Sequence, residues 1–132
     1  MEIVVSNEEV RVPITVFQIK GELTAETEAE LLEQAQDAYD AGMRSLLLDL
    51  SKVTFLSSAG LRAIHQIFIL LRTDSVELSD DAVRAGIKAG TYHSAHLKLL
   101  SPSSDVSQVL KATGFDMFLD IYTSRRKALA SF

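Results

Sequence analysis

The stretch "LLLDLSKVTFLSSAGLRAI", residues 46–64, places an apolar run, a pair of serines and a periodic apolar segment in direct succession. The run at 44–50 is too short for a buried helix, and its unbroken hydrophobicity predicts a central strand covered on both faces. Residues 51–56 are expected to carry the chain over the sheet edge to the serines. Over 57–72 the apolar residues recur at spacings of three and four, which predicts a helix. Its inward positions are Leu61, Ile64, Ile67 or Phe68, and Leu71.

A strand and a helix are also predicted upstream of this stretch. Residues 12–23 alternate in polarity and are rich in β-branched side chains, which predicts a strand that Gly21 ends. The next segment, 24–43, has one apolar face and predicts a helix. Its start is expected at Thr24 or, by the capping-box spacing of Thr27 with Glu30, one turn later; Gly42 is expected to close it.

Downstream, the pattern is weaker at first and then resumes. Residues 73–96 have no strong period, although Ser79 and the two aspartates after it are placed to begin a short helix through Lys88. The remaining predicted elements are a strand at 97–100, a helix that begins at Ser103 or Ser104 and ends before Gly114, a last strand within 115–122, and a terminal helix capped by Thr123 or Ser124. This alternation predicts an α/β fold with helices packed against a sheet.

Composition narrows the possible functions. The length of 132 residues fits one domain, and the absence of cysteine excludes disulfides and thiolate metal sites. A formal net charge of −5 without a basic stripe argues against a nucleic-acid partner. The N-terminus does not read as a signal peptide, and the longest apolar-rich stretch, 63–71, is far short of the roughly 20 residues that span a bilayer. We therefore expect a soluble, cytoplasmic protein with no membrane span.

Three segments together resemble a known family. "IKGELTAETEAEL", the quoted stretch at 46–64 and "LKLLSPSSDVSQVLKATGFDMFLDIYTSRRKAL" fall in the order and spacing of a STAS domain, the family that contains the bacterial anti-sigma factor antagonists. The resemblance implies a single STAS domain over 1–132, with extra residues around 73–93. It implies a mixed, partly open sheet of four or five strands flanked by helices.

The resemblance also implies a phosphorylation site. In the family, the serine two places before the glycine of the strand-to-helix turn is phosphorylated by a partner kinase, and counting back from Gly60 gives Ser58, with Ser57 as the fallback. The implied partners are an anti-sigma factor that is also a serine kinase, and a phosphatase that removes the phosphate. The residues expected to form the contact surface around the acceptor are Thr24, Ser57, Ala59, Gly60, Leu61 and Arg62.

Elementary chemistry is compatible with this switch. If Ser58 begins the helix, its oxygen can accept a hydrogen bond from a free backbone amide, and helix capping is also the plain structural explanation of the serine pair. Ser57 is expected to be a cap or a flanking contact. A phosphate there would add about −1.5 to −2 charge, which a helix N-terminus tolerates and an acidic or desolvated partner surface does not. The modification could therefore control binding without unfolding the protein.

Other functions remain as alternatives. Ser57 and Thr24 stand where many antagonists carry aspartate, which favours a constitutive docking module of the kind found in lipid- or anion-transport assemblies. A small-ligand or nucleotide sensor is a further class. Hydrolase chemistry is not expected, because the turn lacks a Gly-x-Ser-x-Gly pattern and His65 lies about two helical turns past Ser58. His93 and His96 are too few for a metal site, so we expect no metal. We also expect no catalysis by this chain and no cofactor.

Overall fold

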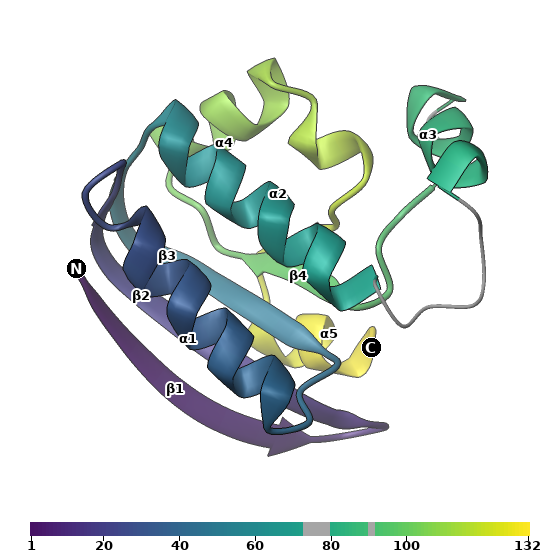
Figure 1. The fold of residues 1–132 in the computed structure, drawn as a ribbon, viewed down its shortest axis with the longest axis horizontal. Helices are drawn as coiled ribbons and strands as arrows, with labels where there is room; N and C mark the ends of the chain where they lie inside the picture. The colour runs from purple at the N-terminus through teal and green to yellow at the C-terminus, as the bar shows by residue number, and fades with distance from the viewer. Residues whose placement is uncertain (73–79, 90–91) are drawn as a thin grey trace.

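The computed structural model describes residues 1–72, 80–89 and 92–132 and shows a five-stranded mixed sheet flanked by helices (Figure 1). The strands are β1 (Glu2–Glu9), β2 (Pro13–Leu23), β3 (Leu46–Leu56), β4 (Leu97–Leu100) and β5 (Ile121–Tyr122), in the order β1-β2-β3-β4-β5. The helices are α1 (Glu28–Asp40), α2 (Ser58–Arg72), α3 (Asp80–Ala89), α4 (Ser104–Ala112) and α5 (Arg125–Ala130), with a short 3₁₀ helix η1 (Phe115–Met117). The predicted fold class is confirmed.

The sheet is open and mixed because only its first pair is antiparallel. β1 runs antiparallel to β2, whereas β2, β3, β4 and β5 are mutually parallel neighbours. Each parallel connection carries a helix, as parallel strands require. The prediction of four or five strands is met by five, but the N-terminal strand was not among the expected elements. β1 is an edge strand with mostly exposed side chains, and this leaves little apolar periodicity in its sequence.

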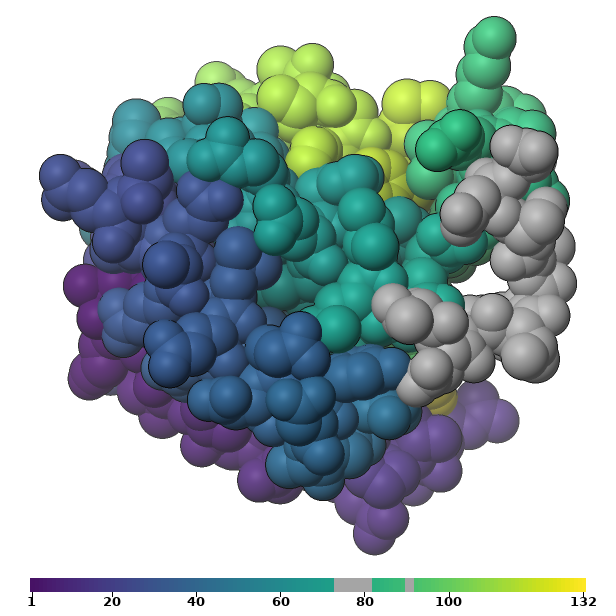
Figure 2. All heavy atoms as spheres, in the orientation of Figure 1, coloured from purple at the N-terminus to yellow at the C-terminus, as the bar shows by residue number. Residues whose placement is uncertain are grey.

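The two faces of the sheet hold separate apolar clusters. Leu46, Leu48 and Leu50 of β3 pack with α1, α2 and α4 on one face, and Leu47 packs with α5 on the other. This confirms that the apolar run is a strand covered on both sides. Helices α1 and α2 lie side by side over the larger cluster, and their side chains form one continuous surface (Figure 2).

Two strand boundaries differ from the sequence prediction. Residues 51–56 do not leave the sheet: they remain in β3, and the ladder with β2 continues to the pair Leu23–Leu56. Gly21 does not end β2 either. It has a φ of +109° and lies at a register shift, so the strand bends there and continues to Leu23.

The last predicted strand is mostly not a strand. Within 115–122, Phe115–Met117 form η1, and only Ile121–Tyr122 pair with β4. The Phe118 ring lies 4.9 Å from that of Phe68 on α2 and 5.4 Å from that of Phe115, centroid to centroid. Packing of these rings against α2 therefore outweighs the loose alternation of the segment.

Most helix boundaries agree with the sequence. α1 begins after Thr27 and is followed by Gly42 in a left-handed conformation, with a φ of +112°. α4 and α5 are capped by the side chains of Ser103 and Ser124. The short helix expected to end at Lys88 is α3, and its Val83 is buried in the larger cluster. Residues 73–79 and 90–91 of the expected extra segment lie outside the described residues.

Candidate functional site

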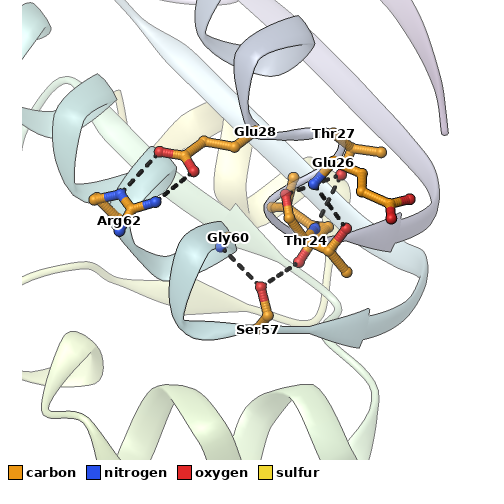
Figure 3. A network of polar contacts seen from close by, with 8 residues as sticks. Thr24, Glu26, Thr27, Glu28, Ser57, Gly60 and Arg62 are labelled. Atoms are coloured by element: carbon orange, nitrogen blue, oxygen red, sulfur yellow. Dashed lines mark hydrogen bonds and ion pairs between the residues drawn. The ribbon is translucent and has the colours of Figure 1, made fainter.

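Two strand-to-helix turns meet at one edge of the sheet. β2 and β3 are parallel and end in register at Leu23 and Leu56, so the residues that follow them, Thr24 and Ser57, come together. Ser57 anchors the meeting point, because its amide donates to the Leu23 carbonyl oxygen at 3.0 Å. The structure thus assembles the two turns that the sequence singled out (Figure 3).

Ser57 caps helix α2. Its Oγ donates to the Leu23 carbonyl oxygen at 3.3 Å and accepts from the Gly60 amide at 3.3 Å (Figure 3). The Ser57 carbonyl also accepts from the Leu61 amide at 3.0 Å, which closes the first helical turn. The expectation that Ser57 acts as a cap is therefore confirmed, and Ser58 does not supply the hydrogen bond that it could have accepted at the start of the helix.

Ser58 occupies a different environment one residue later. It is the first residue of α2 and is exposed. In the part of the chain that the structure describes, its hydroxyl makes no hydrogen bond, whereas the Ser57 hydroxyl makes two. A group-transfer enzyme could reach the Ser58 oxygen without breaking a structural contact.

The next three residues are buried beneath this serine. Ala59 and Leu61 are 6% and 8% exposed, and a Cβ on Gly60 would lie 2.5 Å from the Leu23 carbonyl oxygen and 2.7 Å from a methyl of Leu56. Their predicted place in a contact surface stays a prediction. These three residues pack α2 against the ends of β2 and β3. Ser58 and Arg62 are the exposed side chains of this turn.

Hydroxyl groups organise the turn between β2 and α1. The Thr27 Oγ1 donates to the Glu22 carbonyl at 3.0 Å and accepts from the Thr24 amide at 2.9 Å. The Thr24 Oγ1 accepts from the Glu26 amide at 3.3 Å. Thr24 is half-buried and lies at the edge of the turn nearest Ser57, as Figure 3 shows.

An ion pair joins the two helices beside the serines. The Arg62 guanidinium on α2 donates from Nε and Nη2 to the two carboxylate oxygens of Glu28 on α1, at 2.9 and 2.7 Å (Figure 3). These hydrogen bonds hold the pKa of Glu28 below its usual range and raise that of Arg62. Sequence reasoning named Arg62 but missed Glu28, because 34 residues separate them and only the packing of α1 on α2 brings them together.

An exposed aromatic side chain lies near this edge as well. Phe55, next to the end of β3, is 53% exposed and lines a pocket with Asp105 and Val109 of α4. Residues 51–56 were expected to form a connection, so the sequence predicted no role for Phe55. No signal in the sequence marked Phe55, because its exposure is known only from the structure and single exposed apolar side chains are common.

The histidines do not form a site with the serines. His65 lies among the rings of Phe68, Phe115 and Phe118, and the His93 Nδ1 contacts an Asp120 oxygen at 2.9 Å. Over residues 1–72, 80–89 and 92–132, no group of three or more potential metal ligands is present. Within the same ranges, no helix is long and apolar enough to cross a membrane.

Comparison with known proteins gives a consistent picture. The model of the STAS domain family matches residues 6–79, whereas no curated protein matches the chain. A solved anti-sigma-factor antagonist (STAS) domain protein from Planctomyces limnophilus superposes with a TM-score of 0.70 at 20% identity, covering 98% of this chain and 95% of that one. An anti-sigma factor antagonist from Mycobacterium paratuberculosis gives 0.68 at 18%, covering 98% and 93%.

A third similar structure is the Bacillus cell fate determinant SpoIIAA in its phosphorylated form. Its TM-score is 0.60 at 16% identity, and the match covers 96% of this chain and 97% of that one. The anti-sigma factor antagonist SpoIIAA has also been solved in its unphosphorylated form, which superposes with a TM-score of 0.65 at 16% identity over 96% of this chain and 93% of that one. At these identities the structural likeness shows a shared fold.

Proposed function

This chain belongs to the STAS domain family, and from that premise we propose that it is an anti-sigma factor antagonist in a partner-switching pathway. Unphosphorylated, it binds an anti-sigma factor that is also a serine kinase, and the sigma factor is released. Phosphorylation of Ser58 ends the binding, and a phosphatase restores it. On this proposal the chain works in the cytoplasm by binding and catalyses nothing itself.

The observation that carries the proposal is the contrast between the two serines. Ser58 has an exposed hydroxyl with no hydrogen bond in the described part of the chain, and it stands two residues before Gly60, where the family places its acceptor. Ser57, the fallback, uses its hydroxyl to hold α2 to the end of β2. Modification of Ser57 would cost the hydrogen bond that it donates, whereas modification of Ser58 costs none.

The chemistry is a phosphoryl transfer that the partner performs. The Ser58 oxygen forms a bond to the γ-phosphorus of the kinase's ATP, the bond to the bridging oxygen of ADP breaks, and the hydroxyl proton passes to a base on the kinase. The phosphatase later directs water to the same phosphorus and regenerates the hydroxyl and inorganic phosphate. Each cycle changes the charge at this turn by about −1.5 to −2 and back.

The added charge weakens partner binding without unfolding the domain. The phosphate lies at the first residue of α2, where the positive end of the helix dipole favours an anion. At the same position an apposed acidic or desolvated surface would face two like charges or bury an unpaired dianion, which is costly. The half-buried Thr24 and the exposed Arg62 and Phe55 complete the surface that we expect the kinase to cover.

The decisive experiment is phosphopeptide mapping of the protein isolated from its own cells, growing and stressed, with phosphatases inhibited. Phosphate on Ser58 with an occupancy that changes with condition supports the proposal. A strain carrying Ser58→Ala is the matched control, since it keeps Ser57 and should lose the signal. Phosphate on Ser57 alone would overturn the assignment of the acceptor.

A constitutive docking module is the second candidate. The observation in its favour is that Ser57 and Thr24 stand where many antagonists carry aspartate, and both are engaged here in hydrogen bonds within the turns. Absence of phosphate from both serines under every condition, together with partner binding that survives Ser58→Asp, would favour this function over the switch.

A further inference from the structure

Ser58 and Arg62 are neighbours on the exposed surface of α2. They are four residues apart in one helix, a spacing that brings Cβ atoms to within about 5–6 Å. Ser58 is exposed, and the Arg62 side chain retains 59% of its accessibility while it binds Glu28. Arg62 is also the only Lys or Arg between Lys52 and Arg72. A cation of suitable reach is therefore within one helical turn of the proposed acceptor.

We propose that Arg62 is the residue that binds the phosphate on Ser58, and that it leaves Glu28 to do so. Phosphorylation then exchanges an ion pair between α1 and α2 for one within α2. This inference rests on the proposed function for the presence of the phosphate, but it assigns the phosphate a ligand in this chain and a second structural effect.

Charge and geometry favour the exchange. The carboxylate of Glu28 carries one negative charge, whereas a phosphoserine carries about −1.5 to −2 and offers three acceptor oxygens. Guanidinium groups bind phosphate and carboxylate in the same bidentate manner, so the geometry lost at Glu28 can be regained at the phosphate. The order is also the favourable one, since an anion four residues before a cation complements the helix dipole.

The exchange would also change the charge at the neighbouring turn, between β2 and α1. Glu28 is the first residue of α1, directly after Thr27, whose hydroxyl ties the turn to Glu22 and Thr24. Once Arg62 has moved, the Glu28 carboxylate is left unpaired four residues from Thr24. The surface offered to the partner then gains negative character at both turns, although only one of them is modified (Figure 3).

The test does not require the natural kinase. Phosphoserine is installed at position 58 by genetic encoding in the recombinant chain, and its second pKa is measured by phosphorus NMR titration at low salt. We expect Arg62→Gln to raise this pKa by roughly 0.3 unit or more, because the phosphate dianion loses its cation. Glu28→Gln should lower the pKa, because Arg62 is then released from its competitor.

The control is Arg72→Gln, which removes the same charge from the far end of the same helix. Equal effects of Arg62→Gln and Arg72→Gln would overturn the assignment of Arg62 as phosphate ligand. An effect of Arg62→Gln without any effect of Glu28→Gln would overturn the exchange. Neither result depends on whether cells phosphorylate Ser58, so failure here and failure of the proposed function are separately visible.

Discussion

The two turns at the candidate site follow neighbouring strands but are built in opposite ways. Between β3 and α2 the chain uses a single residue, Ser57, and then buries Ala59, Gly60 and Leu61. Between β2 and α1 it uses residues 24–27, which are half-buried or exposed and are held by threonine hydroxyls. One turn is fixed by close packing and the other by hydrogen bonds at the surface.

The difference suggests a division of labour. Close-packed segments change shape only at a high cost, whereas exposed hydrogen bonds open at a low cost. If the proposed function holds, the packed turn keeps the Ser58 hydroxyl in one place for the kinase, and the hydroxyl-bonded turn beside it can adapt to the partner. Substitutions that disturb packing should therefore lower the free energy of unfolding more than substitutions that remove surface contacts.

Gly60→Ala is expected to lower the free energy of unfolding more than any other substitution proposed below. The new methyl would lie 2.5 Å from the Leu23 carbonyl oxygen, a backbone atom that cannot rotate away, and 2.7 Å from a Leu56 methyl. Overpacking of this kind costs about 1–3 kcal/mol or more, which exceeds the gain of roughly 1 kcal/mol that alanine brings to a helix. Urea denaturation should show a free energy of unfolding lowered by about 2 kcal/mol.

Ser58→Ala is the matched control for Gly60→Ala, because it alters the same helical turn at an exposed position. Its midpoint should stay close to that of the parent protein. A Gly60→Ala variant as stable as the parent would show that α2 can move away from β2, and the picture of a packing-fixed turn would be abandoned.

The sequence predicts this packed turn better than it predicts the residues around it. The apolar run at 46–50 and the spacing of Leu61, Ile64 and Leu71 directly reflect burial, so strand and helix could be assigned from them. β1 could not, because an edge strand buries little and its pattern is weak. The full length of β3 was missed for a similar reason: within 51–56 only Val53 and Leu56 are buried, so the segment lacks the alternation that marks a strand in sequence, and pairing with β2 extends β3 through it.

The roles of the two serines depend on which of them directly precedes the first residue of α2. Either serine can cap a helix, and only the hydrogen bond from the Gly60 amide to the Ser57 Oγ shows which one does. The pairing of Glu28 with Arg62 depends on how α1 lies against α2, a tertiary fact with no trace in local periodicity. The family resemblance pointed to this turn, while the hydrogen bonds within it could be assigned only from the structure.

Replacing each serine by alanine compares what the two hydroxyls contribute to the free energy of unfolding. Ser57→Ala removes the N-cap of α2 and the hydrogen bond to Leu23, and should lower the free energy of unfolding by about 0.5–2 kcal/mol. Ser58→Ala should lower it by much less, since no hydrogen bond is lost. Thermal and urea unfolding of the two variants make the comparison, and equal losses would contradict the assignment of Ser57 as the cap.

The smallest expected effect is electrostatic and depends on pH. Hydrogen bonds from Arg62 lower the pKa of Glu28 in the folded protein, so the ion pair stabilises the fold above the pKa of an unfolded glutamate, about 4.3. That contribution is lost as pH falls through the lowered pKa, because protonation removes the charge that Arg62 binds.

Glu28→Gln should therefore be less stable than the parent near pH 7, and the difference should shrink toward zero in the acid range. The exposure of Arg62 keeps the effect small, and added salt should reduce it at neutral pH. A double cycle with Arg62→Gln isolates the pair; a coupling that is the same at acid and neutral pH would mean that Glu28 acts through packing and not through its charge.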